Sequence, residues 1–220
     1  MAATSSTTQR LEAFSDGVIA IAITLLVLQI DVPNARQGSL FDALLDLWPS
    51  YLAFVLSFVV IGIMWVSHHS MFERIANVDR RLLFLNLLLL MGIAFLPFPT
   101  ALLARYLQQG GENAEFAAAA YSATMMLIGL FFMAMWHHLY RNPGLLVAGI
   151  GAERARTAMV RSVVGPIVYG VTIGLAFLSP EACLAVYALI ALYFAGGPSS
   201  RVATPDQAPA AEAAPVDEEA

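Results

Sequence analysis

The sequence has few charged residues, no lysine and a single cysteine. Charged side chains make up only 12% of the 220 residues, whereas 59% are hydrophobic, and the mean hydropathy is +0.73. These values lie outside the range of ordinary soluble domains and indicate an integral membrane protein. Because Cys183 is the only cysteine, an intrachain disulfide is excluded.

Motifs of metal-dependent or nucleophilic catalysis are also missing from the sequence. There is no His-Glu-x-x-His motif. Adjacent residues on a helix point about 100° apart, so neither His68-His69 nor His137-His138 chelates one ion by itself. Nothing supplies an oriented nucleophile or an acid/base pair in a water-filled cleft. We therefore expect no enzyme activity, no metal centre and no cofactor.

Six apolar segments each approach the roughly 20 residues that a helix needs to cross a bilayer. They lie at about 10–30, 48–72, 82–105, 115–140, 161–179 and 181–197. The sequence therefore predicts an all-α membrane protein with six transmembrane helices in one domain, 10–197. We expect residues 1–9 to be flexible and the acidic tail, 198–220, to be disordered. No small-x-small cleavage site follows Ile30, so the first segment is expected to be retained as a span.

The arginines are distributed unevenly between the two sides that this topology defines. With an even number of spans, both termini and the loops after the second and fourth spans share one side. That side collects Arg10, Arg74, Arg80, Arg81, Arg141, Arg154, Arg156, Arg161 and Arg201, whereas Arg36 and Arg105 lie opposite. By the positive-inside rule, both termini are expected in the cytoplasm.

The first span carries a regular stripe, which we call the seam. It consists of Arg10, Phe14, Gly17, Ile21, Thr24 and Leu28, spaced at alternating steps of four and three residues. At 100° per residue these positions stay on one side of a helix. A stripe of this kind is more often a packing surface than a pore lining, but small, hydroxyl and aliphatic side chains can also line a narrow conduit. Both interpretations remain open at this point.

Polar residues near the ends of several spans indicate a second feature of the first span. A charged residue such as Asp16 is costly in lipid unless it is paired, and Ser15 and Asp16 point away from the seam. We expect a network joining Arg10, Asp16, a histidine of the second span and Asn86. We expect His137 and His138 to reach separately toward the membrane interface. Pro97 and Pro99 are expected to kink or end the third span, with Thr100 bonding to a carbonyl that they free.

Several motifs together resemble a known family. The first span contains R-x-x-x-F-S-D at 10–16, the second ends in W-x-x-H-H at 65–69, and the third contains Asn86 within LLFLNLLLL and then PFPT at 97–100. In this pattern the chain is similar to the transmembrane protein 175 family, in its prokaryotic branch with one six-helix unit per chain. The resemblance covers the first three spans by motif and the last three mainly by hydropathy.

The resemblance implies a potassium-selective channel that lacks the TVGYG filter, a sequence absent here. In the family the first span lines a central pore, and single-unit chains assemble as homotetramers. Carried onto this chain, the constriction and selectivity residues are Ile21, Thr24 and Leu28, which are all members of the seam. The permeant ion would be K⁺, which crosses the cell (inner) membrane passively through the pore. The lipid bilayer would surround the channel, and no nucleic acid would be a partner.

The same resemblance implies a structural anchor for the pore helix. The motif residues would be the anchor, and residues of the second and third spans would be its partners: Arg10, Phe14, Ser15 and Asp16 with His68 or His69 and Asn86.

Three other functions stay open from the sequence. A secondary transporter would have a substrate site at the bilayer midplane between repeats, and the sequence shows neither a midplane charge nor a clear repeat. A proton pathway through Asp16 and the histidines is chemically possible, because histidine titrates near neutral pH. The third is a non-conducting accessory membrane subunit, in which the polar residues only hold helices together.

Overall fold

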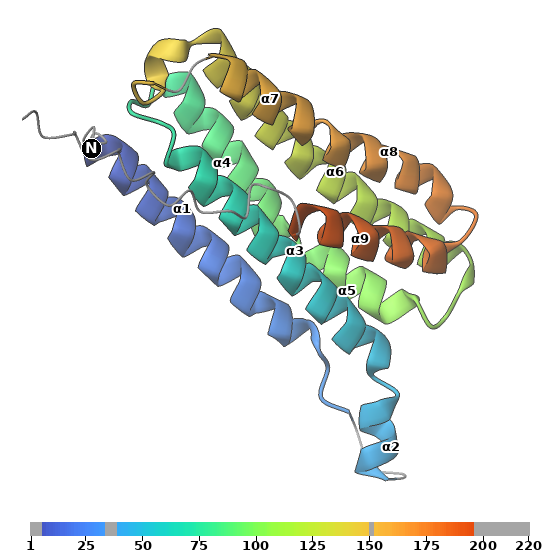
Figure 1. The fold of residues 1–220 in the computed structure, drawn as a ribbon. Coiled ribbons are helices and arrows are strands. Elements are labelled where there is room, and N and C mark those ends of the chain that lie inside the picture. Colours follow the sequence, from blue (N-terminus) through green and yellow to red (C-terminus); the bar gives the residue numbers. More distant parts are fainter. Residues whose placement is uncertain (1–5, 34–38, 150–151, 196–220) are drawn as a thin grey trace, which may run out of the picture.

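The computed structural model describes residues 6–33, 39–149 and 152–195, and these ranges are helical with no β-strand (Figure 1). In chain order the elements are α1 (Ser6–Leu25), η1 (Leu26–Gln29), α2 (Leu40–Leu45), α3 (Trp48–Phe72), α4 (Arg80–Phe95), α5 (Pro97–Tyr106), α6 (Gly111–Arg141), η2 (Pro143–Leu145), α7 (Ala152–Ser162), α8 (Val164–Ala176) and α9 (Pro180–Ala195). The predicted all-α fold is thus confirmed. The predicted tail, 198–220, lies outside the described residues.

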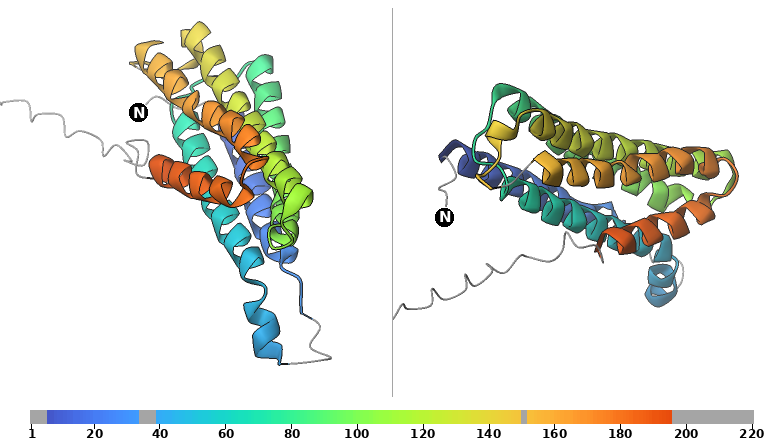
Figure 2. Two further views of the ribbon diagram at one scale, coloured as in Figure 1. Left: turned by 90° about the vertical axis from the view of Figure 1, so that its right-hand side faces the viewer. Right: turned by 45° about the horizontal axis from the view of Figure 1, so that its top comes forward.

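The helices match the predicted spans, with three differences. Among the described residues, five stretches are long and apolar enough to cross a membrane, whereas the described part of α9 is an apolar helix of 16 residues, shorter than the ~20 of a full span. Helix α9 runs obliquely across its neighbours (Figure 2). Helix α1 begins at Ser6, inside the segment expected to be flexible. The short helix α2 was not predicted, because its six residues bury no side chain and so carry no packing pattern.

The third span is broken where the sequence predicts it. Helix α4 ends at Phe95 and α5 begins at Pro97, which has no backbone N–H to continue the helical hydrogen bonds. The Thr100 hydroxyl donates to the Leu96 carbonyl at 2.9 Å, as expected, and lies 2.9 Å from the Ser57 hydroxyl of α3. The kink is thereby tied to a neighbouring helix.

Helix α6 is the central element, because it packs against α4, α5, α7 and α8. Helix α1 lies at one edge of the bundle, against α3 and α4, and α7–α8 lie at the opposite edge (Figure 1). Helices α6 and α8 approach closely at Gly129, where an added Cβ would lie 2.8 Å from Pro166. The buried Tyr187 hydroxyl accepts from Ser122 at 2.6 Å and donates to the Ala118 carbonyl at 3.0 Å, so this polar group is satisfied within the apolar core.

One end of the bundle joins three segments that are distant in sequence. The link after α3 bonds to the link after α6, through Ala76 N–H to the Leu145 carbonyl (2.8 Å) and Val147 N–H to the Arg74 carbonyl (3.0 Å). The Thr8 hydroxyl at the start of α1 donates to the Ala76 carbonyl at 3.3 Å. The segments that the arginine pattern assigns to one side of the membrane therefore lie together, while Arg36 and Arg201 fall outside the described residues.

Candidate functional site

The seam forms an outward face of α1. All six of its residues are exposed in the chain, including Phe14 (53%), Ile21 (61%) and Leu28 (71%). The opposite face of the same helix is buried against α3 and α4, with Ile19 at 2% and Leu26 at 0%. The rest of the chain thus packs against one side of α1 and leaves the other, apolar side exposed. The exposed side includes the large side chain of Phe14.

The α1 helix changes its winding within the seam. The α-helical part ends at Leu25, and Leu26–Gln29 continue as a 3₁₀ turn, so Leu28 lies in the tighter segment. Just before this change, the Thr24 hydroxyl donates to backbone oxygen within its own helix, with Ala20 O at 3.0 Å and Ile21 O at 2.9 Å. Because the hydroxyl proton is used there, the oxygen lone pairs of Thr24 remain available on the exposed face.

A buried hydrogen-bond chain joins α1, α4 and α3. The Ser15 hydroxyl donates to the Leu11 carbonyl at 2.8 Å, and the Asn86 amide donates to Ser15 at 2.9 Å. His68 Nε2 donates to the Asn86 amide oxygen at 2.9 Å, since that oxygen only accepts. Ser15, His68 and Asn86 are all fully buried. This set, the buried chain, fixes how α1 is rotated against its two neighbours.

The His68 ring is also held by packing, because it stacks on Phe72 with ring centroids 4.3 Å apart. Its second nitrogen, Nδ1, is buried with no hydrogen-bond partner among the described residues. With Nε2 as the donor, Nδ1 carries the free lone pair of a neutral ring.

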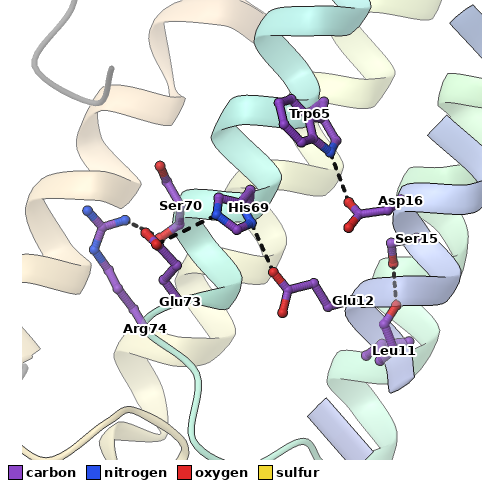
Figure 3. Close-up of polar contacts among 9 residues, drawn as sticks. All are labelled: Leu11, Glu12, Ser15, Asp16, Trp65, His69, Ser70, Glu73 and Arg74. Carbon is purple, nitrogen blue, oxygen red and sulfur yellow. Dashed lines mark hydrogen bonds and ion pairs between the residues drawn. The ribbon is translucent and has the colours of Figure 1, made fainter. Parts of the chain in front are cut away.

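Two further contacts join α1 to α3 beside the buried chain, and we call them the outer pairs (Figure 3). The Trp65 ring N–H donates to Asp16 at 2.9 Å, and His69 Nδ1 lies 2.9 Å from Glu12. His69 also lies 3.6 Å from Glu73, one turn along its own helix. Glu12 and Asp16 are four residues apart on α1, and Trp65 and His69 are four residues apart on the antiparallel helix α3. The two pairs therefore lie one helical turn apart along the same contact between the helices.

The structure divides the expected single network into two sets. Asn86 and His68 bond with Ser15 rather than with Asp16, and Asp16 bonds with Trp65. The physical reason is helical geometry: Ser15 and Asp16 are adjacent and so point about 100° apart. Arg10 and Phe14 are exposed with the seam, and the described residues place no carboxylate in ion-pair contact with Arg10.

Glu12 and Trp65 contribute to these contacts, but sequence reasoning did not assign them to the site. The repeated four-residue spacing, Glu12 to Asp16 on one helix and Trp65 to His69 on the other, was the signal that would have found them. The described part of the chain contains no group of three or more His, Cys, Asp and Glu side chains placed to hold a metal ion.

The expectation for His138 is corrected by the structure. His138 is 7% exposed and lies 2.8 Å from Asp79, which also caps α4 by accepting from the Leu82 N–H at 2.8 Å. Burial opposes the charged form, but the hydrogen bonds from Leu82 and His138 outweigh it and hold the pKa of Asp79 below its ordinary value. His137 is exposed, and its reach toward the membrane interface stays a prediction. A carboxylate at a nearby helix start, rather than the membrane interface, satisfies His138.

Comparisons with known proteins show which protein family has this arrangement. The family model described as endosomal/lysosomal potassium channel TMEM175 matches residues 10–97, which include both sets of polar contacts. A protein of Streptomyces collinus named a potassium channel is 51% identical over 186 residues, covering 84% of this chain and 90% of the relative. The chain belongs to the TMEM175 family.

Other TMEM175 relatives are bacterial and vertebrate. A protein of Chamaesiphon minutus, also named a potassium channel, is 42% identical over 193 residues, covering 86% of this chain and 94% of its own length. The chicken protein is named an endosomal/lysosomal proton channel. It is 37% identical over 137 residues, which are 58% of this chain and 27% of the longer vertebrate protein.

A solved TMEM175 structure shares the fold. The crystal structure of a lysosomal potassium-selective channel TMEM175 homologue from Chamaesiphon minutus superposes with a TM-score of 0.79 at 41% identity. The match covers 87% of this chain and 97% of that one. The family fold therefore extends beyond residues 10–97 into the later helices, where the sequence motifs are weak.

Proposed function

We propose that this chain is the subunit of a potassium-selective channel that passes K⁺ passively through a central pore. The proposal is supported by the bacterial relatives named potassium channels, which match along at least 90% of their length. The single observation that carries it is the uncovered apolar face of α1 on a helix whose other face is fixed within the chain. The reaction involves no covalent chemistry and requires no cofactor beyond the permeant ion.

In this proposal the seam lines the pore when copies of the chain, four in a homotetramer, surround a common axis. Ile21 and Leu28 form apolar constrictions that resist wetting, and Thr24 lies one turn from each. The Thr24 lone pairs replace part of the hydration of the passing ion, because the hydroxyl proton is held by the backbone. The constriction on α1 takes the place of a TVGYG filter.

The buried chain and the outer pairs form the structural anchor of this pore helix. Ser15 and Asn86 fix the rotation of α1 from its buried side, and Asp16 with Trp65 fixes it from the flank. Because neighbouring positions differ by about 100°, an error of one residue in register would turn Ile21 and Leu28 out of the pore. Arg10 and Phe14 belong to the same motif but lie on the exposed side.

The orientation follows from the arginine pattern. The end of the bundle that holds Arg74, Arg80, Arg81 and Arg141 faces the cytoplasm, with both termini on that side of the bacterial inner membrane. The pore helix then enters the membrane from the cytoplasm at its anchor, and Leu28 lies toward the opposite side.

Ion flux from liposomes tests the proposal. Purified protein in vesicles loaded with K⁺ should release it down its gradient faster than vesicles loaded with Na⁺ release theirs, without a coupling ion. Flux that needs a second ion and saturates with substrate supports a secondary transporter instead. Absence of flux from folded, correctly assembled protein supports an accessory subunit.

Proton permeation is the second candidate, and two observations favour it. The vertebrate relatives are named proton channels, and Glu12, His69 and Glu73 place three titratable groups in contact where α1 meets α3. A pH gradient imposed across liposomes without K⁺ or Na⁺ should collapse quickly if protons permeate. A His69→Gln variant should slow that collapse if the cluster carries the protons.

A further inference from the structure

A cavity of about 460 Å³ lies between α3, α6, α7, α8 and α9, away from the seam. Its walls are mostly apolar side chains, among them Val60, Met64, Ile128 and Phe132. A volume of this size is typical of ligand sites, which usually combine apolar walls with a few polar groups. The channel proposal assigns no role to this cavity, because α1 does not line it.

The polar groups of the cavity gather toward one end. Along α3 the lining changes from Val60 and Met64 to Ser67, Ser70 and finally Arg74. These positions are separated by three or four residues and so share one face of the helix. Arg74 lies in the link after α3, at the arginine-rich end of the bundle. The cavity is thus apolar in the interior and polar toward the end where the membrane headgroups begin.

Arg161 of α7 lines the same cavity and has no counter-ion among the residues that the structure describes. It is half-buried and lies in the last turn of α7 (Ala152–Ser162), just before the apolar helix α8. Among the described residues, no carboxylate lies within ion-pair distance of Arg161 or Arg74. A half-buried charge beside apolar side chains is costly unless it meets an anion or water. Two arginines bordering an apolar cavity are therefore suited to a ligand that joins an anionic group to an apolar part.

The one acidic residue of the lining does not supply that anion. Glu153 lies 3.7 Å from Arg156 on its own helix, and its side chain is 84% exposed. Both members of this pair project to solvent, so Glu153 leaves the charge of the two cavity arginines unbalanced.

We propose that the cavity binds one phospholipid of the surrounding bilayer with an anionic headgroup. Its phosphate contacts Arg74 and Arg161, and one acyl chain lies along the apolar wall of α3 and α6. From Val60 to the end of α3 at Phe72 is about 18 Å, enough for the ~15 Å of one hydrocarbon leaflet, and Arg74 follows in the link beyond it. Basic pockets between transmembrane helices on the cytoplasmic side bind anionic headgroups elsewhere, and the same charges explain the preference here.

Lipid binding to the intact, assembled protein tests the proposal. The protein is stripped of lipid in detergent and titrated with dioleoyl phosphatidylglycerol or dioleoyl phosphatidylcholine, and the bound lipids per subunit are counted by native mass spectrometry. We expect one saturable phosphatidylglycerol per subunit and weaker phosphatidylcholine binding. In Arg74→Gln/Arg161→Gln the preference should fall by about 30-fold, as expected for the loss of two charge contacts.

Two further variants make the outcome decisive. Arg156→Gln removes a charge from the same helix without touching the cavity, so it should keep the preference. Ser67→Phe should fill the cavity and exclude the lipid while retaining both arginines, and it decides the question if the double variant does not fold. Equal binding of both lipids by the native protein, an equal loss in Arg156→Gln, or undiminished binding in Ser67→Phe would each overturn the proposal.

Discussion

At the scale of single residues, the partners of the polar side chains on α1 depend more on the direction in which each side chain points from the helix than on its residue type. Ser15 is completely buried and bonds with Asn86, whereas its neighbour Asp16 bonds with Trp65 at the flank. Buried polar groups within a membrane domain must find partners inside the protein, because lipid offers none. The buried chain therefore determines the rotation of α1, and removing its central member should show this.

Replacing Asn86 with leucine should destabilise the protein. The variant keeps the approximate shape of the side chain but leaves Ser15 and His68 without their shared partner, at a cost of about 1–2 kcal/mol. Thermal unfolding in detergent should show a lower Tm than for Asn77→Leu, a control at an exposed asparagine in the link after α3. Equal Tm values for Asn86→Leu and the unmodified protein would contradict the role of the buried chain.

Asp79 should make the stability depend on acid pH. The pKa of its carboxyl is lower in the folded protein than in the unfolded chain, so its contribution is fully present above the ordinary pKa of ~3.9. It is lost as the pH falls through the lowered value. Asp79→Asn retains an N-capping side chain and should flatten the acid limb of a Tm-against-pH curve. An unchanged acid limb in Asp79→Asn would assign that pH dependence to other groups.

At the scale of elements, α1 has one face that the rest of the chain covers and one that it leaves exposed. The seam repeats at steps of four and three and is exposed, while Ile19, Ala22 and Leu26 between those positions are buried. Periodicity alone could separate these faces, but it could not say which one the chain covers, because both are apolar. The contacts of α3 and α4 with α1 show which of the two faces is covered.

The apolar seam residues should control how readily the pore fills with water. Ile21→Asn or Leu28→Asn replaces an exposed apolar side chain with a polar amide, so it should hydrate the constriction and raise single-channel conductance. Val171→Asn is the matched control, since Val171 is 67% exposed on α8, away from the seam. Currents that are the same in all three variants would remove Ile21 and Leu28 from the pore.

Thr24 should influence which ion passes. Thr24→Ala removes the hydroxyl oxygen that faces outward from α1 and should narrow the preference for K⁺ over Na⁺, whereas Thr24→Ser should retain it. Permeability ratios from bi-ionic recordings measure the effect. A ratio preserved in Thr24→Ala would count against any contact between this side chain and the ion.

Much of the fold could be predicted because hydropathy reports long helices directly. The kink at Pro97 and its bond from Thr100 followed from local backbone chemistry. The pairing of His138 with Asp79 could not be predicted in this way, since it joins α6 to the start of α4 across 59 residues of sequence. The same holds for Trp65 with Asp16, because a pattern within one helix does not specify its partner helix.

At the scale of the whole molecule, the seam lies on the outer surface of α1. In the proposed channel, several copies would therefore be arranged with α1 toward a common axis. The cavity proposed to bind lipid lies among α3, α6, α7, α8 and α9, on a different part of the bundle. In these two proposals, assembly and lipid contact use separate surfaces of one subunit.

Cross-linking should reveal the arrangement of copies. Gly17 lies on the seam, and an added Cβ there meets no atom within 4 Å, so Gly17→Cys is accommodated. A short bis-maleimide reagent should join neighbouring subunits in pairs through this position and give a covalent dimer on a denaturing gel, whereas Val171→Cys should not be joined. The native Cys183 is fully buried and should not react. Equal cross-linking from both positions would place the seam away from the axis.

The most direct measurement is the reversal potential of the purified protein in a planar bilayer, with K⁺ on one side, an equal concentration of Na⁺ on the other and the same pH on both. The potassium-channel account predicts a reversal potential displaced strongly from zero in the direction that K⁺ selectivity requires. The displacement should become smaller in Thr24→Ala. A reversal potential at zero would contradict the account. So would a repeat recording with a pH difference imposed, if its reversal potential followed that difference instead of the K⁺ gradient.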